Sequence, residues 1–135
     1  MIFNGQCNCG NVKFSFETHQ GDIYWCHCSI CRKATGTNGI GVMVVDNEAF
    51  TWLEGESFIN LWQKPGHDWQ TWFCTTCGSK LPGHNDENRM FIPVGLIDEH
   101  HEVLKVSHHI WVDSKAHWDE IGGEGVLHPR HFGSA

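Results

Sequence analysis

Seven cysteines in three short clusters carry most of the chemistry available to this sequence. They are Cys7 and Cys9 in a CxC pattern, Cys26, Cys28 and Cys31 in CxCxxC, and Cys74 and Cys77 in CxxC. Because their number is odd, internal disulfides cannot pair all of them. Cysteines clustered so closely are typical of metal ligation or thiol chemistry in a reducing compartment, where structural disulfides are rare.

The CxC and CxxC pairs predict a closed metal site. Each pattern can bring two sulfurs onto one metal, and structural zinc takes four such ligands at about 2.3 Å. We therefore expect Cys7, Cys9, Cys74 and Cys77 to hold a structural zinc that ties the first strand to a later hairpin. A glycine follows each half, at Gly10 and Gly78, as tight turns require. The alternative is four reduced cysteines that pack as small hydrophobic side chains.

The remaining triplet predicts a second zinc of a different kind. Cys26, Cys28 and Cys31 offer three thiolates from one short segment and leave the fourth tetrahedral position open, as in catalytic zinc sites. Two alternatives stay open. His27 or another histidine can supply a fourth ligand and close the site, or two of the cysteines can form a redox pair.

Histidines and tryptophans are also abundant. Most of the eleven histidines are expected to face solvent. His27 lies between two ligands, so it should point away from their metal and either form a supporting hydrogen bond or be exposed. The seven tryptophans should mostly fill the core, although Trp62 and Trp69, which flank the Pro65–Gly66 turn, can instead wall a ligand cleft.

Short strands must position these residues. Alternating apolar residues predict a strand over 11–17, and further β-rich runs cover 23–26, 40–45, 50–53, 57–62, 70–73, 90–94 and 108–112. Two brief helices are predicted, over Ser29–Ala34 with Gly36 as its C-cap and over Ser114–Ile121 with Gly122 as its stop. The pattern indicates a mainly β fold with one or two helical turns.

Length and composition set the broad class. A chain of 135 residues predicts a single domain over 1–135, with a core of about 3–121 and a loosely held tail over 122–135. With 40% hydrophobic and 19% charged residues the chain should be globular, and its net charge of −7 argues against nucleic-acid binding. We find neither a bilayer-spanning apolar run nor a signal peptide at the N-terminus, so we expect no membrane partner and a cytosolic location.

Four segments together resemble the glutathione-dependent formaldehyde-activating family, also called centromere-protein-V-like. They are QCNCGNVKFSF, CHCSICRKATG, FCTTCGSKL and HIWVDSKAHWDEI, and they cover the chain from Cys7 to about Ile121. The resemblance implies a β-tent of short, folded antiparallel sheets with two zincs, one on each cysteine group above. It also implies a carbon–sulfur lyase that reversibly joins glutathione and formaldehyde to S-(hydroxymethyl)glutathione.

The chain departs from this family in two places. Gln70 to Phe73 stand where relatives often carry a basic residue, and His117 stands where proline is common. Candidate partners for substrate carboxylates are Arg32, Lys33, Lys80 and Lys115. Candidate bases are Asp98, Glu99 and the histidine pairs 100–101 and 108–109. We expect an enzyme acting on glutathione or a small thiol; the alternative is a noncatalytic zinc-stabilised module that binds glutathione or a protein.

Overall fold

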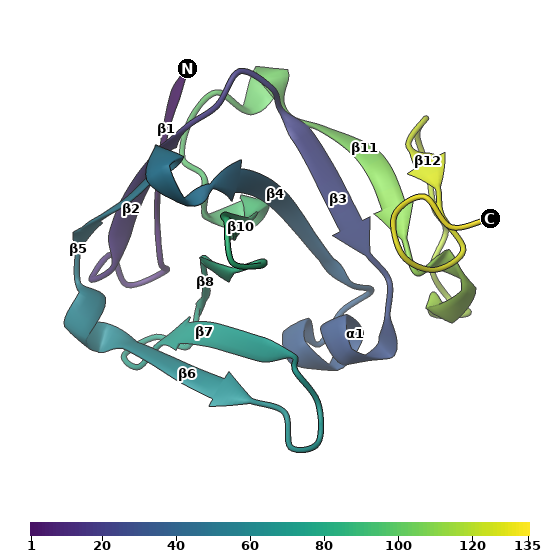
Figure 1. Cartoon of the computed structure of the whole chain (residues 1–135), viewed down its shortest axis with the longest axis horizontal. Coiled ribbons are helices and arrows are strands. Elements are labelled where there is room, and N and C mark those ends of the chain that lie inside the picture. The colour runs from purple at the N-terminus through teal and green to yellow at the C-terminus, as the bar shows by residue number, and fades with distance from the viewer. The chain divides into compact units, whose positions relative to one another are not determined.

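The computed structural model describes residues 1–135, which form short strands and few helical turns (Figure 1). The chain divides into two compact units. Met1–His19 and Val44–Glu102 form the first, and Gln20–Met43 and Val103–Ala135 form the second. The predicted mainly β architecture is confirmed.

Twelve strands and one α-helix make up the regular structure. The strands are β1 (Ile2–Gln6), β2 (Lys13–Glu17), β3 (Asp22–Cys26), β4 (Ile40–Asp46), β5 (Phe50–Glu54), β6 (Ile59–Gln63), β7 (Gln70–Cys74), β8 (Lys80–Leu81), β9 (Gly83–His84), β10 (Arg89–Pro93), β11 (Lys105–Ile110) and β12 (Val126–Leu127). The helix is α1 (Ser29–Thr35), and 3-10 turns cover Asn47–Ala49, Glu56–Phe58, Val94–Leu96, His101–Val103 and Val112–Ser114. No helix is both long and apolar enough to cross a bilayer.

The first unit contains an antiparallel sheet in the order β1-β2-β5. Its central strand alternates as predicted: Val12, Phe14 and Phe16 are buried, whereas Lys13 and Ser15 are partly exposed. Phe16 stacks on Phe3 of the neighbouring strand with ring centroids 5.0 Å apart. Burying each of these aromatic rings stabilises the fold by about 1.5–3 kcal/mol.

A second antiparallel sheet of the first unit, in the order β6-β7-β8, ends at the CxxC motif. Cys74 is the last residue of β7, and Cys77 lies in the turn between β7 and β8. Cys74, Cys7, Val12 and Leu81 form one buried hydrophobic cluster. The sheet therefore presents its turn directly to the CxC loop that follows β1.

In the second unit, β3 lies between two partners (Figure 1). It pairs antiparallel with residues 40–42 of β4 and parallel with β11, and β12 pairs parallel with β11. Two pairings in this unit are thus parallel, although the expected sheets are antiparallel throughout. Parallel strands need a long connection, and the residues between β3 and β11 supply one.

Helix α1 confirms one of the two predicted helices. Cys28 is its N-cap, and Gly36 closes it in the left-handed conformation, with its N–H donating to the carbonyl of Arg32 at 2.8 Å. A C-terminal glycine of this kind is the usual end of a helix.

The helix predicted over Ser114–Ile121 is absent, so that prediction is wrong. A 3-10 turn covers Val112–Ser114 instead, and Lys115 is extended. The N–H groups of residues 111–113 donate to the carbonyls of residues 128–130. These contacts hold the residues just before Ser114 in another conformation, so no helix begins there.

Part of the C-terminal tail, which is expected to be loosely held, is hydrogen-bonded to the second unit's sheet. Residues 126–127 form β12, and the His128 N–H donates to the His109 carbonyl at 2.8 Å. The His128 side chain is 7% exposed and lies beside the ring of Phe132. The hydrogen bonds of β11 therefore order the tail.

Candidate metal centres

The first centre is the four-cysteine group, which lies wholly within the first unit. The sulfurs of Cys7, Cys9, Cys74 and Cys77 all lie within 4.8 Å of one another. Cys9 Sγ lies 3.6 Å from Cys7 Sγ and 3.8 Å from Cys74 Sγ. The grouping predicted from the two spacings is therefore present.

These distances fit a tetrahedral metal. Zinc with bonds of about 2.3 Å holds its sulfur ligands about 3.8 Å apart. A disulfide would need about 2.05 Å, and all seven cysteines of the chain are free. The four-cysteine group can therefore bind a metal ion without rearrangement.

Two glycine turns and several donors shape this group. Gly10 and Gly78 both have positive φ, at 80° and 77°, and the Gly78 N–H donates to the Cys74 carbonyl at 2.8 Å. The Ser79 hydroxyl lies 3.2 Å from Cys77 Sγ. Hydrogen bonds from this hydroxyl and from the Ser79 N–H lower the pKa of Cys77 to about 5. Cys77 therefore favours the thiolate form that a metal requires.

The second centre is the triplet of Cys26, Cys28 and Cys31, which lies wholly within the second unit. Cys26 ends β3, Cys28 caps α1, and Cys31 is buried in the first turn of that helix. All three sulfurs lie within 4.8 Å of one another. Because β3 runs directly into the helix cap, one short segment supplies the whole group.

Cys28 is the thiol of the triplet that loses its proton first. Hydrogen bonds from Cys26 and Cys31 lower its pKa to about 2, and the Cys31 N–H lies 3.3 Å from its sulfur. Hydrogen bonds with Cys26 and Cys28 raise the pKa of Cys31 well above its usual range. The hydrogen bonds of the group thus favour a thiolate at Cys28, and a bound cation would favour ionisation of the other two cysteines.

His27 is buried rather than exposed, at 1% of its accessible surface. Its Nε2 lies 2.9 Å from Nδ1 of His109, and its Nδ1 lies 3.4 Å from a carboxylate oxygen of Asp119. Burial, followed by the nearby His109, lowers the pKa of His27, so its ring is neutral. His27 Nε2 bonds to His109, His27 Nδ1 faces the Asp119 carboxylate without forming a hydrogen bond, and no histidine joins the three sulfurs, so the structure gives no support to His27 as a fourth ligand.

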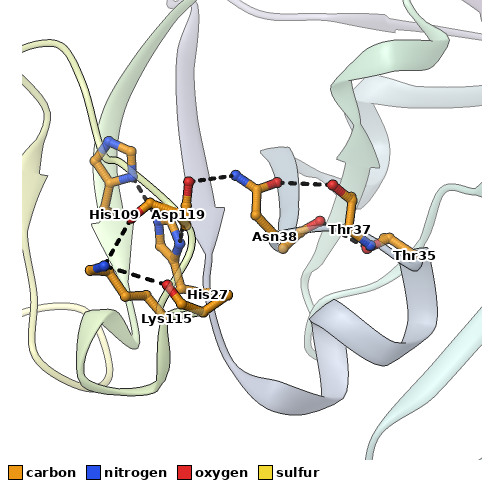
Figure 2. Close-up of polar contacts among 9 residues, drawn as sticks. His27, Thr35, Thr37, Asn38, His109, Lys115 and Asp119 are labelled. Atoms are coloured by element: carbon orange, nitrogen blue, oxygen red, sulfur yellow. Dashed lines mark hydrogen bonds and ion pairs between the residues drawn. The ribbon is translucent and has the colours of Figure 1, made fainter.

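Asp119 contacts both His27, which lies within the triplet, and Asn38, which follows α1 (Figure 2). Besides facing His27, it accepts a hydrogen bond from Asn38 Nδ2 at 3.3 Å, between α1 and β4. Lys115 Nζ donates to the backbone carbonyl of Asp119 at 2.9 Å. Asp119 therefore links the triplet, through His27, to the loop that follows α1, through Asn38.

Sequence reasoning did not find the roles of His109 and Asp119. Their contacts with His27 span 82 and 92 positions of the chain, which no local pattern reveals. The only sequence feature that pointed to them was that both residues lie within the segment HIWVDSKAHWDEI.

The basic candidates lie in different environments. Lys80 Nζ bonds to Thr71 Oγ1 and lies 5.2 Å from the Trp69 ring centre, and Lys115 binds backbone carbonyls. The Nε of Arg32 is buried without a hydrogen-bond partner. Of these three residues, Arg32 is the one with a side-chain donor that lacks a hydrogen-bond partner.

The acidic candidates and the outlying tryptophans lie in the first unit. Glu99 accepts hydrogen bonds from the backbone and side chain of Asn4, so it is already engaged. Asp98 is exposed. Trp62 and Trp69 meet edge to face with centroids 6.4 Å apart, and Trp62 is 49% exposed. None of these four residues lies in either cysteine group.

Residues 2–114 match the sequence model of a family described as "Glutathione-dependent formaldehyde-activating enzyme". The chain belongs to this family. The matched range contains all seven cysteines, His27 and His109, and it ends before Asp119.

Two individual comparisons are consistent with this family. A Halomonas elongata protein, provisionally named glutathione-dependent formaldehyde-activating enzyme, is 29% identical over 89 residues, which are 60% of this chain and 55% of that protein. The chain thus spans about half the length of this relative. The crystal structure of a Rhodobacter sphaeroides protein matches with a TM-score of 0.60 and 22% identity, covering 76% of this chain and 96% of that one, and supports the fold alone.

Proposed function

We propose that the chain is a zinc-dependent carbon–sulfur lyase that reversibly joins glutathione and formaldehyde to S-(hydroxymethyl)glutathione. The observation that carries this proposal is the triplet of Cys26, Cys28 and Cys31, three clustered sulfurs without a fourth protein ligand. Membership of the family supports the substrate pair. The seven free cysteines favour the cytosol as the place of reaction, because they require a reducing compartment.

The proposed reaction is an addition in which no atom is lost. The sulfur of glutathione forms a bond to the carbonyl carbon of formaldehyde, the π bond of the carbonyl breaks, and the thiol proton ends on its oxygen. The reverse reaction releases both reactants. Neither direction needs an oxidant or a reductant.

The three thiolates of the triplet would hold the catalytic zinc. When bound, zinc supplies a fourth position that keeps a substrate thiol ionised at neutral pH. A free thiol of pKa about 8.5 is only about 3% ionised at pH 7, so the substrate's reactive form is otherwise scarce. Cys28, whose pKa is lowered by hydrogen bonds with Cys26 and Cys31, would contribute the first of the three ligands.

Arg32 is the proposed binding partner of a glutathione carboxylate. It follows Cys31 directly on α1, and its Nε is buried without a partner. Three thiolates on one divalent cation leave a charge of about −1, which repels an anionic substrate unless a cation lies nearby. The guanidinium of Arg32 would offset that charge if it lies near the bound metal, and it could bind a carboxylate with two hydrogen bonds.

The four-cysteine group has a structural role in this proposal. Its cysteines come from two distant parts of the first unit, and Cys7 and Cys74 are buried in one hydrophobic cluster. A closed tetrahedral site has no position left for a substrate. Zinc there would cross-link the CxC loop to the β7–β8 turn.

The test is exchange of formaldehyde with glutathione, followed by NMR magnetisation transfer. Wild type should accelerate exchange above buffer, and Cys28→Ala should reduce the rate to the buffer level. Ser29→Ala, an exposed change in the same segment, should retain the wild-type rate. If wild-type protein with both metals bound leaves the buffer rate unchanged, the lyase is refuted for this substrate, and a noncatalytic zinc-stabilised binding module becomes the better account.

A further inference from the structure

A pocket of about 520 Å³ lies in the first unit. It is bordered by residues of β5, β6, β7, β9 and β10, and none of the seven cysteines lines it. Sites for small organic molecules usually have volumes of about 300–1,000 Å³. The pocket is therefore large enough for such a ligand, and its lining contains no residue of either cysteine group.

Three aromatic side chains give the pocket firm walls. Phe50 and Trp52 meet edge to face, with centroids 4.8 Å apart and planes at 83°. Trp72 lies directly on Gly83, where an added Cβ would come within 2.0 Å of the indole ring. Trp52 and Trp72 also pack against the buried cluster that contains Cys7 and Cys74. The walls are thus held in place before any ligand arrives.

The polar residues of the pocket determine which ligand charge it can bind. Glu56 is its only Asp, Glu, Lys or Arg, and the carboxylate of Glu56 is exposed with no ion pair. Two amides, Asn47 and Asn60, and the imidazole of His84 complete the polar lining. A ligand there meets one negative charge and no permanent positive charge.

We propose that this pocket binds a small organic cation, an ammonium group carried on an apolar or aromatic body. Aromatic rings attract cations through the negative potential of their faces, and a carboxylate beside them adds direct charge attraction. The aromatic walls would cover the apolar body of the same ligand. Glutathione, whose two carboxylates outnumber its one ammonium at neutral pH, does not fit this charge pattern, so the site is independent of the proposed lyase reaction.

The experiment compares three probes of similar shape and different charge on the zinc-loaded full chain. These are the 2-phenylethylammonium cation, neutral 2-phenylethanol and the phenylacetate anion, each titrated while the Trp indole N–H signals are followed by NMR. We expect the cation to bind at least about tenfold more tightly than the alcohol and phenylacetate to bind least. The shifts should be confined to the signals of Trp52 and Trp72.

A charge-neutralising variant with a matched control makes the test decisive. Glu56→Gln should weaken binding of the cation about tenfold while leaving binding of the alcohol unchanged. Glu48→Gln, an exposed change that lies outside the pocket lining, should change neither. Both positions are exposed, so neither variant should fail to fold. The proposal is overturned if the cation gives no saturable shift up to about 10 mM, if the alcohol or anion binds equally well, or if Glu56→Gln leaves cation binding unchanged.

Discussion

His27 Nε2 and His109 Nδ1 lie 2.9 Å apart, and both imidazoles are buried. One belongs to the CxCxxC segment and the other to β11, the parallel neighbour of β3. Because burial lowers the pKa of both rings, they are neutral, and one can donate while the other accepts. The contact holds the triplet segment against the sheet of the second unit.

Removing the Asp119 carboxylate should weaken metal binding at the triplet. In Asp119→Ala, His27 and Asn38 lose their shared partner, so the segment that holds the three sulfurs becomes less ordered. Outer partners of this kind typically contribute about 10–100-fold to metal affinity. We expect a loss in that range, measured by competition with a chromophoric chelator.

Asp113→Ala is the control for this variant. The Asp113 side chain is 64% exposed and makes only a 4.0 Å contact with Arg130. It should leave the affinity of the triplet for zinc unchanged. Equal affinities in both variants and wild type would show that Asp119 plays no positioning role.

The two cysteine groups should differ in their effect on folding. Cys77→Ala removes a ligand from the closed group, and structural zinc in small domains contributes on the order of 10 kcal/mol to folding. We expect Cys77→Ala to unfold or to melt far below wild type when followed by circular dichroism. Cys28→Ala should melt within a few degrees of wild type, and a Cys77 variant with wild-type stability would contradict the structural role.

The aromatic core of the first sheet should be costly to truncate. Phe14 is fully buried and contacts the rings of Phe16, Phe50 and Trp52. We expect Phe14→Ala to lower the free energy of unfolding in urea by about 3–5 kcal/mol. Phe58→Ala, at a ring that is 39% exposed, should cost much less. Similar losses of unfolding free energy in the two variants would contradict the assignment of Phe14 to the core.

Deleting residues 122–135 tests whether the tail is part of the fold. The deletion removes β12 and the buried His128, and it exposes β11 and His109. We expect a lower melting temperature and faster amide exchange at residues 108–110, measured by hydrogen–deuterium exchange. Unchanged amide exchange at residues 108–110 would show that the tail is only loosely held.

Local patterns predicted most of the strands and both cysteine groups. The alternation of Val12, Phe14 and Phe16, the C-terminal glycine of α1 and the Cys-Gly turns are short-range features, so they can be read along the chain. The absence of a helix over Ser114–Ile121 and the order of the tail depend on hydrogen bonds between segments 15 or more residues apart. The contacts of His27 with His109 and Asp119 were inaccessible for the same reason.

The central claim is that seven thiols divide into a closed group of four and an open group of three. Metal content, measured by inductively coupled plasma mass spectrometry on protein purified without chelator, tests it most directly. The account predicts about two zinc ions per wild-type chain and about one in folded Cys28→Ala. One zinc or none in folded wild-type protein, or an unchanged zinc content in Cys28→Ala, would contradict it.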